Sequence, residues 1–113
     1  MRYFKLEEFD CTFTGKNKMD AEFLYEIDDL RGRCGFPFVI TSGYRDPSHP
    51  VEADKEQPGR HAEGIAADIA VSNGSERRTI VQEALSMGFG GIGVAKDFVH
   101  VDLRKSGYVM WSY

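Results

Sequence analysis

The segment GRHAEGIAADI, residues 59–69, places a histidine and an aspartate within a run of small residues. The apolar segment GIAADIAV, residues 64–71, predicts a buried strand. Because side chains alternate between the two faces of a strand, an offset of seven would put His61 and Asp68 on opposite faces. We therefore expect His61 in the loop before the strand, with Gly64 allowing the chain to bend back. An unpaired Asp68 carboxylate would be costly to bury, so it needs a partner.

A second histidine, His100, lies in another apolar segment, FVHVDL, residues 98–103. Neighbouring strands that carry imidazole and carboxylate groups inward need something to satisfy them, and a divalent cation does so directly. Two histidines and one carboxylate leave a fourth tetrahedral position for water, which is the pattern of a catalytic zinc site. On the segment at 59–69 alone, the alternative is a surface ion pair or a histidine that is hydrogen-bonded in the core.

Two helices are expected around this segment. The stretch MDAEFLYEIDDLRGRCG, residues 19–35, predicts a helix that Asp20 caps and Gly35 ends. The stretch SERRTIVQEALSMG, residues 75–88, predicts the second helix. The apolar positions expected to face the core are Phe23, Leu24, Ile27 and Leu30 in the first helix, and Ile80, Val81, Ala84 and Leu85 in the second.

The remaining apolar segments predict short strands, at residues 37–41, 64–71, 90–95 and 98–103. The last two are expected to form a hairpin that turns at Lys96 and Asp97. Residues 42–60 form one long loop, and loops of that length in compact domains are usually functional. The element order predicts a single α+β domain over residues 1–113, with a small, mostly antiparallel sheet and helices packed on it.

Composition and charge exclude several classes of protein. With 42% hydrophobic and 28% charged residues, the 113-residue chain is not expected to be disordered. A net charge of −4 argues against a nucleic-acid partner. No segment approaches the roughly 18 apolar residues of a membrane span, and the start MRYFKLEEFD lacks the apolar region of a signal peptide. Cys11 and Cys34 are expected to be reduced thiols, with a disulfide between them as the alternative.

The segments RHAEGIAADI and DFVHVDLR, with SGYR upstream, resemble the zinc-dependent murein peptidases. These include the D-Ala-D-Ala carboxypeptidases, the vancomycin-resistance D,D-dipeptidases and the phage L-alanyl-D-glutamate endopeptidases. The pattern H-x-x-G-x-A-x-D is met at His61, Gly64, Ala66 and Asp68, and the resemblance runs from about Thr41 to the end of the chain. It implies the small α+β fold that these peptidases share with the hedgehog signalling domain, and zinc held by His61, Asp68 and His100.

The resemblance also implies the catalytic groups. Asp97, three positions before the last zinc histidine, would be the general base, and Arg45 of SGYR would bind the substrate carbonyl and stabilise the oxyanion. Gly59 stands where many relatives have a serine. The rival base is Asp102, because an offset of two puts it on the same strand face as His100. The other role open to Asp102 is that of an ion-pair partner, with Arg104 as the candidate.

Other polar and aromatic residues are expected to have no part in the chemistry. His49, Glu52, Asp54 and Glu56 are expected on a solvated loop. The aromatic residues that close the chain, Tyr108, Trp111 and Tyr113, are expected to pack in the core, with a wall of the substrate groove as the alternative.

These observations predict a monomeric zinc peptidase that hydrolyses peptidoglycan stem peptides, at the L-Ala–D-Glu bond. Without a signal peptide it would be a phage or prophage lysin, made in the cytoplasm and acting on the bacterial wall after release, or part of a virion. The alternatives are a D-Ala-D-Ala carboxypeptidase or dipeptidase, and a non-catalytic zinc-containing binding or virion structural module of the same fold.

Overall fold

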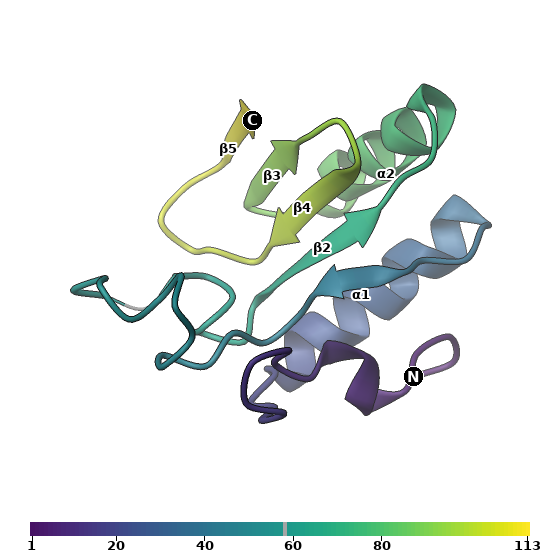
Figure 1. Cartoon of the computed structure of the whole chain (residues 1–113). Helices are drawn as coiled ribbons and strands as arrows, with labels where there is room; N and C mark the ends of the chain where they lie inside the picture. The colour runs from purple at the N-terminus through teal and green to yellow at the C-terminus, as the bar shows by residue number, and fades with distance from the viewer. Residues whose placement is uncertain (58) are drawn as a thin grey trace.

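The computed structural model describes residues 1–57 and 59–113 and has the α+β architecture expected (Figure 1). Two 14-residue helices, α1 (Ala21–Cys34) and α2 (Gly74–Met87), lie on the same face of a sheet (Figure 1). A short 3₁₀ helix, η1 (Leu6–Phe9), lies near the N-terminus. Within the described ranges, neither helix is long and apolar enough to cross a membrane.

The sheet has five strands in the order β1–β2–β4–β3–β5. In chain order the strands are β1 (Ile40–Ser42), β2 (Ala66–Ala70), β3 (Gly91–Val94), β4 (Phe98–Asp102) and β5 (Val109–Ser112). The pairs β1–β2, β2–β4 and β3–β4 are antiparallel, and β3–β5 is parallel. The prediction of a mostly antiparallel sheet is therefore confirmed, and the hairpin between β3 and β4 turns at residues 95–97 as expected.

Both helices begin and end at the residues that the sequence indicates. The Asp20 carboxylate accepts a hydrogen bond from the first turn of α1, and the Asn73 side chain does the same for α2. Each helix ends at a glycine, Gly35 for α1 and Gly88 for α2. The cap hydrogen bonds satisfy backbone donors that have no partner within the helix, which fixes where each helix starts.

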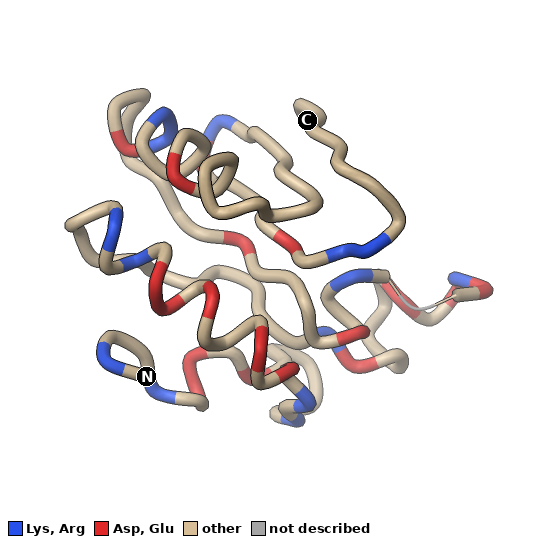
Figure 2. The backbone as a smooth tube through the Cα atoms, turned by 180° about the vertical axis from the view of Figure 1, so that it is seen from behind, with Lys and Arg blue, Asp and Glu red and all other residues tan. Residues whose placement is uncertain are grey.

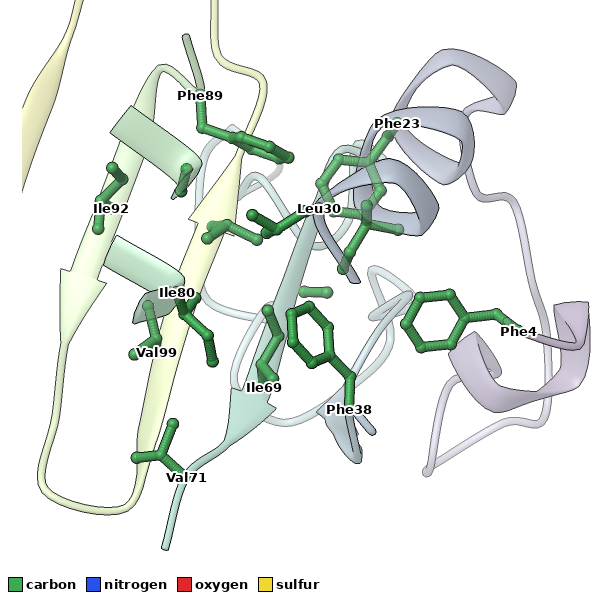
Figure 3. Packing of buried hydrophobic residues seen from close by; sticks show 14 of the residues in the cluster. Phe4, Phe23, Leu30, Phe38, Ile69, Val71, Ile80, Phe89, Ile92 and Val99 are labelled. Carbon is green, nitrogen blue, oxygen red and sulfur yellow. The ribbon is translucent and has the colours of Figure 1, made fainter. Parts of the chain in front are cut away.

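The hydrophobic core lies between the sheet and the two helices. Figure 3 shows Ile69 and Val99 of the sheet packed against side chains from both helices. The inner face predicted for α2 wrongly includes Leu85, which is 55% exposed. Ile80 and Ala84 are buried and Val81 packs, partly buried, against the core, whereas Leu85 lies at the surface.

The sequence places one strand early and misses another. The strand predicted at residues 37–41 is β1, which runs from Ile40 to Ser42; Phe38 before it is buried in the core, and the Val39 carbonyl accepts a hydrogen bond from Ala70 of β2. The edge strand β5 was not predicted. Its residues, VMWS, are mostly exposed, so they lack the alternation of buried and exposed residues that marks a strand.

One row of cross-strand partners spans the sheet and defines the site. Ser42, Asp68, His100, Gly93 and Trp111 follow one another across β1, β2, β4, β3 and β5. The residues next to this row along β2 and β4 are buried in the core on the helix side. Because neighbouring side chains along a strand point to opposite faces, the row lies on the face that the helices do not cover.

The helix side of the molecule carries acidic residues. Figure 2 views the molecule from that side and shows acidic positions along α1, whose acids are Glu22, Glu26, Asp28 and Asp29. One of them, Asp28, is buried and accepts hydrogen bonds from the backbone of Arg2 and Tyr3, which ties the N-terminal segment to α1. The acidic face of α1 thus lies on the side of the sheet opposite the row that contains Asp68 and His100.

Candidate metal and catalytic site

His61 reaches the site from the loop that precedes β2, as the sequence predicts. It lies in a turn, five residues before β2 begins. Gly64 completes that turn with a φ of +77°, and a Cβ at this position would collide with the backbone carbonyl of Lys18. The chain therefore bends back only because residue 64 has no side chain.

Three ligand atoms converge on the helix-free face of the sheet. The His61 Nε2 atom lies 3.2 Å from Asp68 Oδ1, and the His100 Nδ1 atom lies 3.0 Å from the same oxygen. One ligand atom from each of the three residues lies within 4.8 Å of the other two. The structure thus brings together the three residues that the sequence indicated as metal ligands.

The outer nitrogens of both imidazoles are held by fixed acceptors. His61 Nδ1 donates to the carbonyl oxygen of Gly43 (2.9 Å), and His100 Nε2 donates to Asp102 Oδ2 (2.7 Å). A neutral imidazole carries only one proton, so these bonds leave lone pairs on the two inner nitrogens. Both lone pairs point toward the Asp68 oxygen, which has lone pairs of its own.

This arrangement fits a metal ion. Lone pairs that face one another repel unless protons or a cation lie between them. Two nitrogens and one carboxylate oxygen are a donor set that zinc prefers, and ligating histidines usually donate their other N–H to a carboxylate or a carbonyl. The chain would therefore hold zinc through His61, Asp68 and His100, with Gly43 and Asp102 orienting the two rings.

The pKa values of the site respond to this crowding of charges. Burial alone would raise the pKa of Asp68, but hydrogen bonds from His100 and His61 outweigh it and lower that pKa to about 2. Burial alone would lower the pKa of His100, but its bonds to Asp102 and Asp68 raise it above the ordinary value. Without a metal, both shifts favour a protonated His100 beside an ionised Asp68, so a proton lies where a bound cation would lie.

Asp102 is a positioning group for His100. Its side chain is 0% exposed and also accepts hydrogen bonds from Arg104, at 2.9 Å from Nε and 2.7 Å from Nη2. Burial opposes ionisation, but the bonds from His100 and Arg104 hold the pKa of Asp102 well below its usual range. The ion pair with Arg104 that the sequence suggested is present, and both carboxylate oxygens are engaged.

The SGYR segment, residues 42–45, is bonded directly to the metal site. The Arg45 backbone N–H donates to the carbonyl of His61 (3.2 Å), next to the bond between His61 and Gly43. The Arg45 guanidinium contacts Ser42 Oγ at 3.2 Å and Glu52 Oε2 at 3.5 Å. Arg45 therefore lies beside the ligands, as expected, with its planar fork of donors held from both sides.

A cavity of about 350 Å³ opens beside the three ligand residues. It is lined by Arg45, Lys55, Gly59, Arg60, His61, Asp68, Phe98, His100, Arg104, Trp111 and Tyr113. Of the described residues in this lining, four are Lys or Arg and Asp68 is the acid. Each of these four side chains also pairs with a carboxylate, Arg45 and Lys55 with Glu52, Arg60 with Glu63 and Arg104 with Asp102, so the lining offers cationic donors that are held in place by ion pairs.

Asp97 is not brought to the three ligand residues. It lies exposed in the turn between β3 and β4, where its backbone carbonyl accepts a hydrogen bond from Val71. Among the described residues that line the cavity, Asp97 is absent. The general base implied by the resemblance therefore lies outside the cavity in this conformation.

Near the cavity, Glu52 differs from what the sequence suggested. Glu52 was expected on a solvated loop, but it is only 4% exposed and accepts hydrogen bonds from Lys55 Nζ (2.7 Å) and the Gly59 backbone (2.9 Å). A Cβ at Gly59 would crowd the Glu52 carboxylate, so a serine could not stand there without a shift. His49 packs against Phe13 and does not line the cavity.

Trp111 and Tyr113 of the aromatic C-terminal segment line the cavity and not the core, whereas Tyr108 is exposed and does not line this cavity. The Trp111 ring lies 5.2 Å from the His100 ring, and a Cβ on Gly93 would collide with the indole. A Cβ on Gly91 would likewise collide with the Asp102 carboxylate. The alternation of glycines with Ile92 and Val94 was the signal that could have revealed this, because it leaves one face of β3 bare.

Two oriented imidazoles and a carboxylate, beside a cavity on an α+β sheet, define the site of a zinc hydrolase. A family model described as Peptidase M15 matches residues 2–102, and the chain belongs to this family. Membership supports, at the coarse level, a zinc-dependent peptidase that acts on murein, which confirms the family indicated by the sequence motifs. A comparison with curated proteins found no match.

Proposed function

We propose that this zinc peptidase hydrolyses the L-Ala–D-Glu bond of peptidoglycan stem peptides. The observation that carries the proposal is the convergence of His61, Asp68 and His100 at a cavity whose lining includes four Lys or Arg side chains. Stem peptides carry free carboxylates, so this lining matches the charge of the substrate. The D-Ala-D-Ala carboxypeptidase and dipeptidase activities of related enzymes are the alternatives that an experiment must separate.

The residues of the chain have separate tasks in this reaction. When bound, zinc polarises a carbonyl and makes water nucleophilic at neutral pH. Arg45 is proposed to donate to the substrate carbonyl and to stabilise the negative charge that develops on its oxygen. Asp102 holds the His100 ring so that Nδ1 faces Asp68 and can bind the metal.

Asp97 is proposed as the general base, on the strength of the resemblance. Its carboxylate is exposed and can accept a proton, but it has to approach the cavity through a movement of the β3–β4 turn. Asp97→Asn is then expected to keep zinc and fold and to lose about 10²-fold or more in rate. An Asp97→Asn enzyme with unchanged rate would remove Asp97 from the mechanism.

The L-Ala–D-Glu assignment is supported by the two sides of the cavity. Arg45, Lys55 and Arg60 line the cavity from the loop before β2, and Trp111 and Tyr113 line it from the C-terminal segment. We propose that a stem crosses the sheet between these two sets of side chains. A pocket for a free amino terminus, as a dipeptidase requires, would call for acidic lining. Asp68 is the acid among the described lining residues, and it is a metal ligand. We also propose that the protein acts on the bacterial wall as a phage-type lysin.

Digestion of purified peptidoglycan by the zinc-loaded protein tests the proposal. Mass spectrometry of the products should show new amino-terminal D-Glu, and Arg45→Lys should lose most of this activity although the charge is kept, because an ammonium lacks the planar fork. Release of D-Ala without new amino-terminal D-Glu would assign a carboxypeptidase. Absence of any cleavage would contradict the assignment of an enzyme and favour a binding or virion structural module.

A further inference from the structure

Three aromatic rings form a continuous wall along the β5 side of the cavity. The ring centroids of Phe98 and Tyr113 are 5.0 Å apart, and those of Trp111 and Tyr113 are 6.3 Å apart. All three residues line the cavity beside His100. Tyr113 is 69% exposed, so its ring is accessible to a ligand from solvent.

The position of the Trp111 indole is built into the sheet. Gly93 separates His100 from Trp111 in the cross-strand row, and its missing side chain lets the indole lie next to the imidazole. The Arg104 guanidinium carbon lies 5.0 Å from the centre of the indole and also pairs with Asp102. A cation and a glycine therefore fix the ring that ends the metal-binding row.

The opposite side of the cavity has a different chemistry. Arg45, Lys55 and Arg60 line it from the loop before β2. The cavity thus has a cationic side and an aromatic side, with the metal ligands between them. A ligand that crosses it should be anionic at one end and should present a flat face of C–H groups at the other.

A peptidoglycan stem attached to its glycan strand has these two ends. From D-Glu onward the stem carries carboxylates, whereas its L-Ala is joined to the lactyl group of N-acetylmuramic acid. The C–H bonds on one face of a sugar ring carry small positive charges and are attracted to the negative face of an aromatic ring. If the scissile bond follows L-Ala, the sugar lies one residue from the metal, at the distance of a neighbouring wall.

We propose that Phe98, Trp111 and Tyr113 form a subsite for the N-acetylmuramic acid that carries the stem, so that the protein acts on glycan-linked stems in preference to free peptides. This subsite rests on the proposed function, because cleavage after L-Ala is what places the sugar next to the metal ligands. Trp111 and Tyr113 lie beyond residues 2–102, the part matched by the family model, so the subsite adds to the ligands that lie within that part.

Ligand binding can be measured without catalysis, because Trp111 is the one tryptophan of the chain. The zinc-loaded protein is titrated with N-acetylmuramyl-L-alanine, which has no L-Ala–D-Glu bond to cut, and with N-acetyl-L-alanine, which lacks the sugar. We expect a saturable change in tryptophan emission with the first ligand and no change with the second at the same concentrations. Equal responses to the two ligands would overturn the subsite.

Variants test the residues of the subsite. Tyr113→Ala should weaken binding of N-acetylmuramyl-L-alanine by about two- to tenfold, the range expected for one aromatic contact. Tyr108→Ala is the matched control, because Tyr108 is 82% exposed and does not line this cavity. Equal binding by Tyr113→Ala and the unchanged protein would overturn the proposal. So would a dimer in sedimentation velocity that Tyr113→Ala dissociates, since the wall would then be an interface between copies.

A paired kinetic experiment separates this proposal from the bond assignment. The initial rate of cleavage is measured on stems linked to sugar and on the same stems freed by an amidase. A preference for the linked stem that Tyr113→Ala abolishes, with the L-Ala–D-Glu bond cut, supports the subsite. Cleavage of that bond at equal rates on the two substrates contradicts the subsite alone, whereas cleavage at D-Ala contradicts the proposed bond and with it the placement of the sugar beside the metal ligands.

Discussion

Replacing Asp102 by Asn should weaken zinc binding although residue 102 is not a metal ligand. The Asp102 carboxylate accepts hydrogen bonds from four donors, which are His100 Nε2 and the backbone N, Nε and Nη2 of Arg104. An amide of the same shape has one oxygen and one NH₂ group. In either orientation the NH₂ group therefore meets donors of Arg104 or His100.

The magnitude follows from these contacts. If the amide NH₂ faces His100, the ring is driven to accept at Nε2 and to carry its proton on Nδ1, the nitrogen that faces Asp68. Loss of such an orienting partner costs about 10- to 100-fold in metal affinity, which is about 1.4–2.8 kcal/mol. The zinc-free protein should also lose about 2–3 kcal/mol of stability, because donors to a charged buried acceptor are left unpaired.

The assay is a competition for zinc between the protein and a chromophoric chelator at neutral pH, with urea unfolding of the zinc-free forms alongside. Asp97→Asn makes the same chemical change on an exposed acid and should leave stability within about 0.5 kcal/mol. Its zinc affinity should be unchanged. An Asp102→Asn affinity within twofold of that of the unchanged protein would refute the view that Asp102 orients His100.

Further predictions concern the ligands, the loop and the glycine strand. Alanine at any of the three candidate ligands should lower zinc content, measured by elemental mass spectrometry, together with Tm, because bound metal stabilises the folded state; full occupancy in all three variants would contradict the site. Burial opposes ionisation of Glu52, but hydrogen bonds from Lys55 and Gly59 lower its pKa. Its carboxylate therefore stabilises the fold above its unfolded pKa, and that stability is lost as the pH falls through the lowered value. The Tm difference between the unchanged protein and Glu52→Gln should be largest at neutral pH and should disappear at acid pH. A difference independent of pH would contradict this. Gly93→Ala should cost about 1–3 kcal/mol in urea unfolding and shift tryptophan emission, because the new Cβ collides with the indole. Gly74→Ala is the control, because a Cβ there would make only an ordinary van der Waals contact with the Arg77 side chain, and equal effects of the two substitutions would refute the packing argument.

The sequence could indicate the candidate metal ligands because strand alternation and charge burial constrain them. Asp68 and His100 lie in apolar strands, so each had to have a polar partner, and the offset of seven required His61 to come from a loop. The same rules placed Asp102 on the face of His100. These inferences also required the strands of Asp68 and His100 to be neighbours, which the β2–β4 pairing confirms, and the family resemblance implied the same set of three residues.

The aromatic wall and the buried loop acid could not be predicted in the same way. Trp111 reaches His100 only because β5 adds to the sheet beside β3, a pairing that depends on residues almost twenty positions apart. The burial of Glu52 depends on three partners that the long loop brings back to it, including the backbone of Gly59. An acid in a polar loop gives no local sign that it will be buried.

The glycines of β3 link the fold to the site. A strand whose site-facing positions are Gly91 and Gly93 gains little from side-chain packing on that face and loses roughly 0.5–1 kcal/mol per glycine relative to alanine. The compensation lies on each side of it, where the Asp102–Arg104 pair and the Trp111 indole occupy the space that the missing side chains leave. The Asp102–Arg104 pair orients His100, and the Trp111 indole lines the cavity, so both neighbours of the site depend on the absence of side chains from β3. A side chain at residue 93 should therefore disturb the aromatic wall, whereas one at residue 91 should disturb zinc binding.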